Sequence, residues 1–185
     1  MSVTRTKTAG LILLVALVAA AVGYFAAAWR GSQLSSSSPT SGSAQPSAAP
    51  IFAATLPDLA GKHQKIEQWR GKVLVVNFWA TWCAPCLEEI PEFIKLQNRY
   101  GEQGLQFVGI AIDQKDKIEA FAEQNGINYP ILAGEANAID LSRKAGNRLG
   151  ALPYTLIIDR AGQVVATELG GLTEAKLERV IKPLF

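Results

Sequence analysis

Apolar positions along this chain alternate between short continuous runs and stretches with helical spacing. The runs at residues 73–79 and 105–112 are almost entirely apolar, which is typical of strands covered on both faces of a sheet. Between them, apolar side chains recur at helical spacing up to about residue 100, with Pro91 as an interior interruption. Two buried strands joined by a helix are expected to lie parallel in one sheet.

The second half of the chain continues this alternation. The expected elements are, in order, a helix at 115–125, an extended stretch at 129–132, a helix near 136–145, strands at 154–159 and 163–169, and a last helix ending near residue 182. The tight turn Arg160-Ala161-Gly162 separates the two strands, which are therefore predicted to form an antiparallel hairpin. Thr173 is the predicted N-cap of the last helix.

Residues 1–30 have the character of a membrane segment. The uncharged run 9–29 has the length of about 20 residues that spans a bilayer. Arg5 and Lys7 precede it, which predicts a single-pass anchor in the inner membrane with its N-terminus in the cytoplasm. A cleaved secretory signal is the alternative, because Ala26-Ala27-Ala28 offers the small residues that a signal peptidase accepts. Under both interpretations the rest of the chain is extracytoplasmic, or periplasmic.

Composition divides the remaining chain in two. Residues 31–50 are uncharged and rich in Ser, Ala, Pro and Gly, which predicts a flexible linker. Residues 51–185 are expected to form one domain around a single core, since 49% of the 185 residues are hydrophobic. Acidic and basic residues beyond position 50 are nearly equal in number, and no basic patch argues for nucleic acid as a partner.

Cys83 and Cys86 are the only cysteines, and they lie where the strand at 73–79 passes into a helix. A helix N-terminus stabilises a thiolate, which is the reactive form of cysteine. Cys83 is therefore predicted to attack, and Cys86, one turn further along the helix, to displace a partner bound to Cys83. The sequence thus predicts a dithiol that opens and closes.

Three other interpretations of the cysteine pair are weaker. A structural disulfide across two residues closes too small a loop to stabilise much. A zinc site needs four ligands, whereas the chain adds only His63 to the two cysteines. Covalent haem attachment needs a histidine where this chain has Leu87. No metal and no organic cofactor is expected, only the redox-active disulfide itself.

Several separated motifs resemble the thioredoxin superfamily, and within it the membrane-anchored disulfide reductases of the TlpA and ResA type. The most specific is Asn-Phe-Trp-Ala-Thr-Trp-Cys-Ala-Pro-Cys at 77–86, and a second is Leu-Pro-Tyr-Thr at 152–155. The resemblance implies an α/β, thioredoxin-like fold, with a central mixed sheet flanked by helices and an N-terminal extension. The long interval from Asp113 to Pro153 matches the αβ segment that this subgroup inserts between the CxxC helix unit and the cis-Pro strand.

The resemblance also implies a substrate site around Cys83. Pro153 matches a cis-proline that faces the cysteines, and the backbone of Leu152 would pair with an extended substrate segment. Trp82, Ala84 and Pro85 would form the rest of the contact surface.

A third implied role concerns protons. Asn77 replaces the buried acid of plain thioredoxins, so another group must take the proton of Cys86. Glu89 matches an acidic residue of the ResA-like proteins and lies on the same helix face as Cys86. A solvated surface glutamate is the alternative for Glu89, and it is the interpretation that we adopt for Glu88. Trp79, at the end of a buried strand, is expected in the core.

The predicted function is an extracytoplasmic thiol:disulfide oxidoreductase that reduces disulfides of secreted or membrane-facing proteins, with electrons from a transmembrane thiol donor. Maturation of cytochrome c or of a terminal oxidase is the context that the family suggests. The alternatives are a disulfide-forming oxidase, which would use the same cysteines with the opposite electron flow, and a non-catalytic binding or chaperone module. The Ala84-Pro85 spacer lacks the histidine typical of strong oxidants, which favours the reductase.

Overall fold

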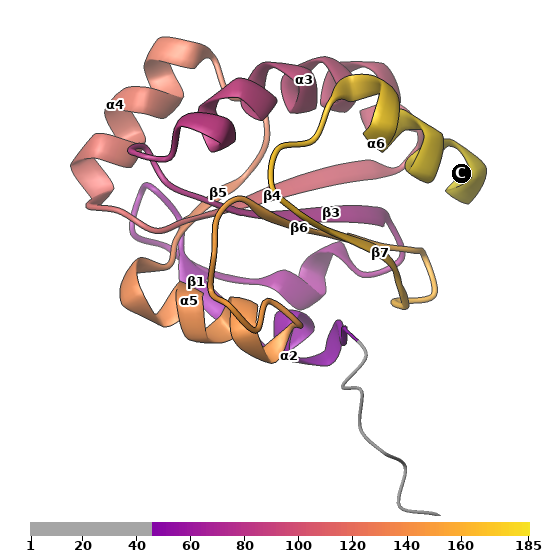
Figure 1. Ribbon diagram of the computed structural model, residues 1–185, viewed down its shortest axis with the longest axis horizontal. Helices are drawn as coiled ribbons and strands as arrows, with labels where there is room; N and C mark the ends of the chain where they lie inside the picture. The colour runs from indigo at the N-terminus through magenta and orange to yellow at the C-terminus, as the bar shows by residue number, and fades with distance from the viewer. Residues whose placement is uncertain (1–45) are drawn as a thin grey trace, which may run out of the picture. The chain divides into compact units, whose positions relative to one another are not determined.

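A five-stranded mixed sheet forms the centre of the protein in a computed structural model that describes residues 46–185 (Figure 1). Its strands are β3 (Val73–Trp79), β4 (Leu105–Ala111), β5 (Ile131–Ala133), β6 (Tyr154–Ile158) and β7 (Val164–Leu169). Their order across the sheet is β5-β4-β3-β6-β7. β4 pairs parallel with β3 and β5, whereas β6 pairs antiparallel with β3 and β7.

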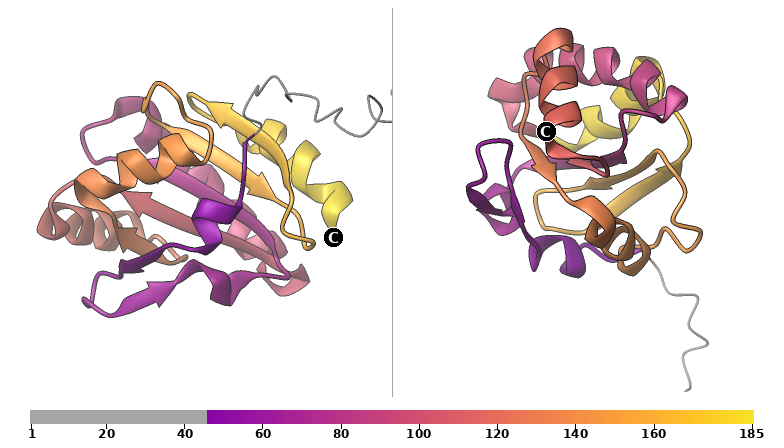
Figure 2. Two further views of the ribbon diagram at one scale, coloured as in Figure 1. Left: turned by 90° about the horizontal axis from the view of Figure 1, so that it is seen from below. Right: turned by 90° about the vertical axis from the view of Figure 1, so that its left-hand side faces the viewer.

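Helices cover both faces of this sheet (Figures 1 and 2). One face carries α3 (Ala84–Tyr100), α4 (Lys115–Asn125) and α6 (Glu174–Ile181). The other carries α2 (Ala49–Phe52), α5 (Glu135–Lys144) and a small antiparallel hairpin of β1 (Thr55–Pro57) and β2 (His63–Lys65). This three-layer arrangement confirms the thioredoxin-like fold class, including the α5 segment inserted before β6.

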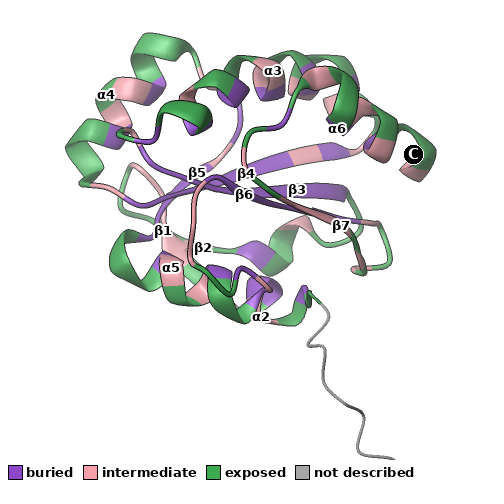
Figure 3. Ribbon diagram, viewed as in Figure 1, coloured by how far each residue is buried: buried purple, intermediate pink, exposed green. Residues whose placement is uncertain are grey.

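The strand β3 shows why the sheet must be covered on both sides. Successive side chains of a strand point to opposite faces. Val73 and Val75 therefore pack with residues of α3 and α6, whereas Leu74 and Val76 pack with residues of α2 and α5. All seven β3 residues are buried, and the centre of the sheet is buried throughout (Figure 3). By the same alternation Asn77 lies on the α3 face, where the chemistry is located.

The larger elements agree with the sequence predictions to within one or two residues. β5 begins at Ile131, two residues later than predicted, and the Tyr129 ring packs against Phe107 ahead of the strand. The β1–β2 hairpin was not predicted, since each strand has three residues and alternating polarity over three positions gives no clear period. Three short 3₁₀ turns, at Ile66–Trp69, Gly101–Gln103 and Lys182–Leu184, were not predicted either.

The packed unit starts a few residues before the predicted boundary at residue 51. Ala48 is 5% exposed and packs in the core together with Ile51 and Phe52 of α2. Burial of these side chains fixes the end of the predicted linker 31–50 against the domain. The predicted anchor or signal at 1–30, and the linker up to residue 45, lie outside the described residues. Between residues 46 and 185, no helix has both the length and the apolar character needed to cross a membrane.

Candidate active site

The cysteine pair lies where β3 passes into α3. Cys83 is the N-cap of α3, with extended backbone angles of φ −94° and ψ 98°. Pro85 occupies the first turn, where its missing N–H costs no helical hydrogen bond. The sequence therefore places one cysteine at the helix start and the other one turn inside it.

Cys83 and Cys86 form a disulfide with an S–S distance of 2.02 Å and a Cα–Cα distance of 5.3 Å. Cys83 is 6% exposed, whereas Cys86 is fully buried. The two sulfurs are thus unequal in access to a partner, in the order that an attacking Cys83 and a resolving Cys86 require. Their assignment to these two roles stays a prediction.

An apolar cluster surrounds the disulfide. Both cysteines pack with Trp79, Ile90 and Ile118, and the half-buried Leu152 packs against the same cluster. Trp79 is 1% exposed, which confirms its place in the core. Its indole fits against β4 because residue 109 is glycine, where an added Cβ would lie 3.0 Å from Trp79 Nε1.

The exposed surface next to Cys83 consists of the residues predicted to touch the substrate. Trp82 is 68% exposed, and Ala84 and Pro85 are exposed as well. An exposed indole that directly precedes the redox cysteine offers a large contact area to a bound polypeptide.

The loop before β6 has the conformation that the resemblance implies. The Leu152–Pro153 peptide bond is cis. Within residues 46–185, the N–H and C=O of Leu152 have no hydrogen-bond partner, whereas both backbone groups of Ala151 bond to the Asn147 side chain. Free backbone groups beside the disulfide are what an extended substrate segment needs for pairing.

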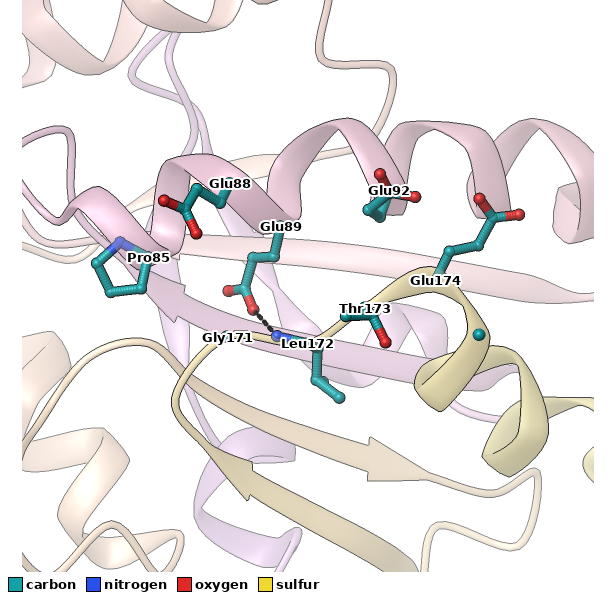
Figure 4. A pocket seen from close by; sticks show the side chains of 9 residues that line it. Pro85, Glu88, Glu89, Glu92, Gly171, Leu172, Thr173 and Glu174 are labelled. Carbon is teal, nitrogen blue, oxygen red and sulfur yellow. Dashed lines mark hydrogen bonds between the residues drawn. The ribbon is translucent and has the colours of Figure 1, made fainter.

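Glu89 is buried on α3, with 2% of its surface exposed. Its Oε1 accepts a hydrogen bond from Asn77 Nδ2 at 2.7 Å. Its Oε2 accepts a second one from the Leu172 N–H at 2.9 Å, which Figure 4 shows. Burial raises the pKa of Glu89 to about 7, against the lowering effect of these two donors. The alternative of a solvated surface glutamate is therefore wrong for Glu89, and it is correct for the exposed Glu88.

Asn77 connects Glu89 to β6. Its Nδ2 also donates to Thr155 Oγ1 at 3.0 Å, while its Oδ1 is buried and has no partner within residues 46–185. A half-turn of the amide would bring Oδ1 toward Glu89, where it could accept the proton of a neutral carboxyl group. The amide at position 77 is therefore suited to both protonation states of Glu89.

A cavity of about 460 Å³ opens over Glu89, between the start of α3 and the loop that leads into α6 (Figure 4). The carboxylates of Glu88, Glu92 and Glu174 line it together with Glu89. Water in this space would give the buried carboxyl group a route for proton exchange with the solvent.

Sequence reasoning missed two contributors to this arrangement, Leu172 and Thr155. The sequence around Leu172 indicates no more than a loop, because nothing local shows that its N–H reaches a carboxylate 83 positions away. The pairing of Asn77 with Thr155 in adjacent strands could have been inferred once β3 and β6 were aligned as neighbours.

The fold and the site together define a thioredoxin-like enzyme that exchanges thiols and disulfides through two cysteines. The chain belongs to the AhpC/TSA family, which matches residues 47–167. It is 34% identical over 139 residues to the thiol-disulfide oxidoreductase ResA of Bacillus thuringiensis, covering 74% of this chain and 76% of that protein. It is also 34% identical over 139 residues to the protein of that name from Geobacillus kaustophilus, covering 75% of this chain and 76% of that protein.

A solved structure shows the same relationship. It is the thiol:disulfide interchange protein of the thioredoxin family from Chlorobium tepidum, which superimposes with a TM-score of 0.66 at 27% identity. The superposition covers 76% of this chain and 95% of that one. These relatives confirm the resemblance to the ResA type and the activity of a thiol-disulfide oxidoreductase.

Proposed function

We propose that this enzyme reduces disulfides of extracytoplasmic proteins, with Cys83 as the attacking and Cys86 as the resolving sulfur. The observation that carries the proposal is the difference in exposure between Cys83 and Cys86, on the same helix as the buried Glu89, whose pKa is raised to about 7. The more accessible sulfur begins the helix, and the buried sulfur lies one turn from a carboxyl group that can take a proton near neutral pH.

In the first step, the Cys83 thiolate attacks one sulfur of the substrate disulfide. The Cys83–substrate bond forms, the substrate S–S bond breaks, and the leaving thiolate takes up a proton. The positive end of α3 favours the thiolate before attack. The free backbone groups of Leu152 and the exposed Trp82 hold the substrate chain across Cys83.

In the second step, Cys86 gives its proton to the ionised Glu89 and attacks Cys83. The Cys83–Cys86 disulfide forms, and the second substrate sulfur leaves as a thiol after protonation. Two electrons have passed from the enzyme to the substrate. Neutral Glu89 then returns its proton to the solvent through the cavity above it.

The location of this reaction is part of the proposal. The uncharged run 9–29, preceded by Arg5 and Lys7, supports an inner-membrane anchor that places the domain on the periplasmic side. Disulfides persist in that compartment, so a reductase there needs a transmembrane thiol donor to restore Cys83 and Cys86. Apocytochrome c and copper-site proteins of a terminal oxidase are the substrate classes that the family suggests.

Trapping of mixed disulfides tests the proposal. A Cys86→Ala variant, expressed as the full chain, should accumulate disulfides between Cys83 and its substrates, which mass spectrometry can identify after non-reducing electrophoresis. The control is the Cys83→Ala/Cys86→Ala double variant. The absence of any adduct specific to Cys83 would overturn the reductase proposal and favour a binding or chaperone role.

A further inference from the structure

Residues 143–150, which we call the α5–β6 loop, run from the last turn of α5 towards β6 and present an exposed leucine. Leu149 is 77% exposed, more than any other large apolar side chain of residues 46–185. A single exposed leucine is common on protein surfaces and indicates nothing by itself. Three further features distinguish this loop: its ordered backbone, its positive charge and its contact with the first residues of the domain.

The backbone of the loop is held by Asn147, which is 3% exposed. Its Nδ2 donates to Ser142 Oγ and to the Ala151 carbonyl, and its Oδ1 accepts from the Ala151 N–H. The Gly150 N–H donates to the Asn147 carbonyl at 3.0 Å. Leu149 therefore projects from a backbone that is already fixed, so a partner that covers it need not order the loop first.

Basic side chains surround this leucine in the sequence. Arg143, Lys144 and Arg148 are exposed. Arg143 lies 3.2 Å from Asp140, whereas Lys144 and Arg148 make no ion pair with any residue of 46–185. An apolar side chain among free basic groups is the combination that binds the surface of an anionic bilayer.

The α5–β6 loop also lies where the chain enters the domain. An added Cβ at Gly146 would lie 3.2 Å from the Pro46 Cβ, so the first described residue packs against the loop. Both belong to the face of the sheet that carries α2 and α5, and α4 covers the opposite face (Figure 1). The predicted linker therefore joins the domain beside Leu149.

The length of chain before Pro46 limits how far this face can move from the predicted anchor. The uncharged run ends at Trp29, and the sixteen residues 30–45 would span about 22 Å on average as a random coil. A domain of about 140 residues is roughly 35–40 Å across. Since the tether is shorter than the domain, the surface around Pro46 meets the membrane more often than the opposite face does.

From these observations we infer that the α5–β6 loop docks on the anionic membrane surface, with Leu149 among the lipid headgroups and Lys144 and Arg148 beside lipid phosphates. Leu149 precedes Leu152 by three positions, so docking would hold the substrate-binding side of the redox centre close to the bilayer, where a transmembrane thiol donor would lie. The inference rests on the anchor of the proposed function and adds a second, reversible contact with the lipid.

Paramagnetic NMR of the full chain tests the inference. The protein would be embedded in nanodiscs of phosphatidylglycerol and phosphatidylcholine that contain a trace of a lipid with a gadolinium chelate, which weakens the signals of amides near the bilayer. Amides of residues 146–150 should lose the most intensity, and those of 115–125 in α4 the least. Discs of phosphatidylcholine alone, or high salt, should reduce this contrast.

Variants assign the contrast to the loop. Leu149→Ser and Arg148→Glu should each reduce the loss of intensity at residues 146–150, whereas Leu149→Ile should keep it. The matched control is Lys115→Glu, at an exposed lysine of α4 on the opposite face, which should leave the pattern unchanged. All of these variants should reduce a soluble disulfide peptide at the wild-type rate, because the loop side chains take no part in the exchange.

The outcomes separate the inference from the proposed function. Equal loss of intensity on both faces, or an unchanged pattern in Leu149→Ser and Arg148→Glu, would overturn the docking of the loop and leave the anchored reductase standing. Failure of the full chain to elute with the discs would overturn the anchor and this inference together, whereas the Cys83 adducts of Cys86→Ala would still support the exchange chemistry. Slower substrate reduction in cells by the loop variants, without contrast in discs, would assign the loop to a protein partner instead.

Discussion

Glu89 on α3 and Asn77 on β3 are joined by a buried hydrogen bond of 2.7 Å, at the point where a plain thioredoxin would carry its acid on the strand. In this protein the carboxyl group lies on the helix α3, and the strand carries an amide that donates a hydrogen bond to it. The amide of Asn77 cannot titrate, so Glu89 is the group at this position that changes charge near neutral pH. Two of the predictions below follow from this site.

Glu89 should make the stability of the oxidised protein depend on pH. Its pKa is raised from 4.5 to about 7 in the folded state, so the folded state binds the proton more tightly than the unfolded state does. The free energy of unfolding should therefore fall as pH rises from about 4.5 to about 7, by up to about 3 kcal/mol. Glu89→Gln should lose this dependence and be the more stable protein at pH 8, in denaturant titrations at a series of pH values.

The glutamine variant is expected to fit, because its Oε1 can accept from the Leu172 N–H and its Nε2 can donate to the unpaired Asn77 Oδ1 after the amide turns. Glu88→Gln, one position away and exposed, is the matched control and should keep the wild-type dependence. Parallel stability curves for wild type and Glu89→Gln would contradict the raised pKa.

Glu89 should also set the pH dependence of resolution by Cys86. The ionised carboxylate accepts the Cys86 proton, so the rate of resolution in single-turnover exchange should rise with pH through about 7. In Glu89→Gln this inflection should disappear, and the rate at pH 8 should fall by on the order of 10²-fold. Stopped-flow exchange with a pre-formed Cys83 mixed disulfide is the measurement, and identical profiles for the two proteins would remove Glu89 from the mechanism.

The reduced protein should be alkylated first at Cys83. Cys83 begins the helix and is 6% exposed, whereas Cys86 is fully buried. Iodoacetamide should modify Cys86→Ala at the fast rate of the wild type and Cys83→Ala much more slowly, as followed by mass spectrometry. If Cys86 reacted as fast as Cys83, the assignment of the attacking sulfur would have to be reversed.

Gly134 should be needed to place α5. In Gly134→Ala the new methyl group would lie 2.4 Å from the Ala138 Cβ, which predicts a loss of stability of about 1–3 kcal/mol. The second change Ala138→Gly removes the opposing methyl group and should restore part of the loss, less the roughly 1 kcal/mol that glycine costs inside a helix. Denaturant unfolding of the single and double variants would show this; simple addition of the two losses would contradict a direct clash.

The sequence could predict the large elements because each has a period of its own. β3 and α3 were placed to the residue or nearly so, since a continuous apolar run and a helical spacing need no tertiary information. The hairpin of β1 and β2 lacks such a period, and Asp58 near it bridges to Leu132, a contact that no local signal encodes. Likewise, Gly146 lies against Pro46, a hundred positions earlier in the chain.

By itself, the sequence determined the reactive pair, the strand that precedes it and the helix that begins at it, because these depend on residues close to one another along the chain. Only the tertiary structure decided the state of Glu89, since it is buried in the assembled domain and its two hydrogen bonds come from the strand β3 and from a loop 83 positions away. A carboxyl group titrates according to the water and dipoles around it, and those are supplied by whatever the fold packs against it. The position of the reactive cysteines therefore follows from neighbouring residues in the sequence, whereas the pKa of the group that exchanges protons with them depends on the folded domain.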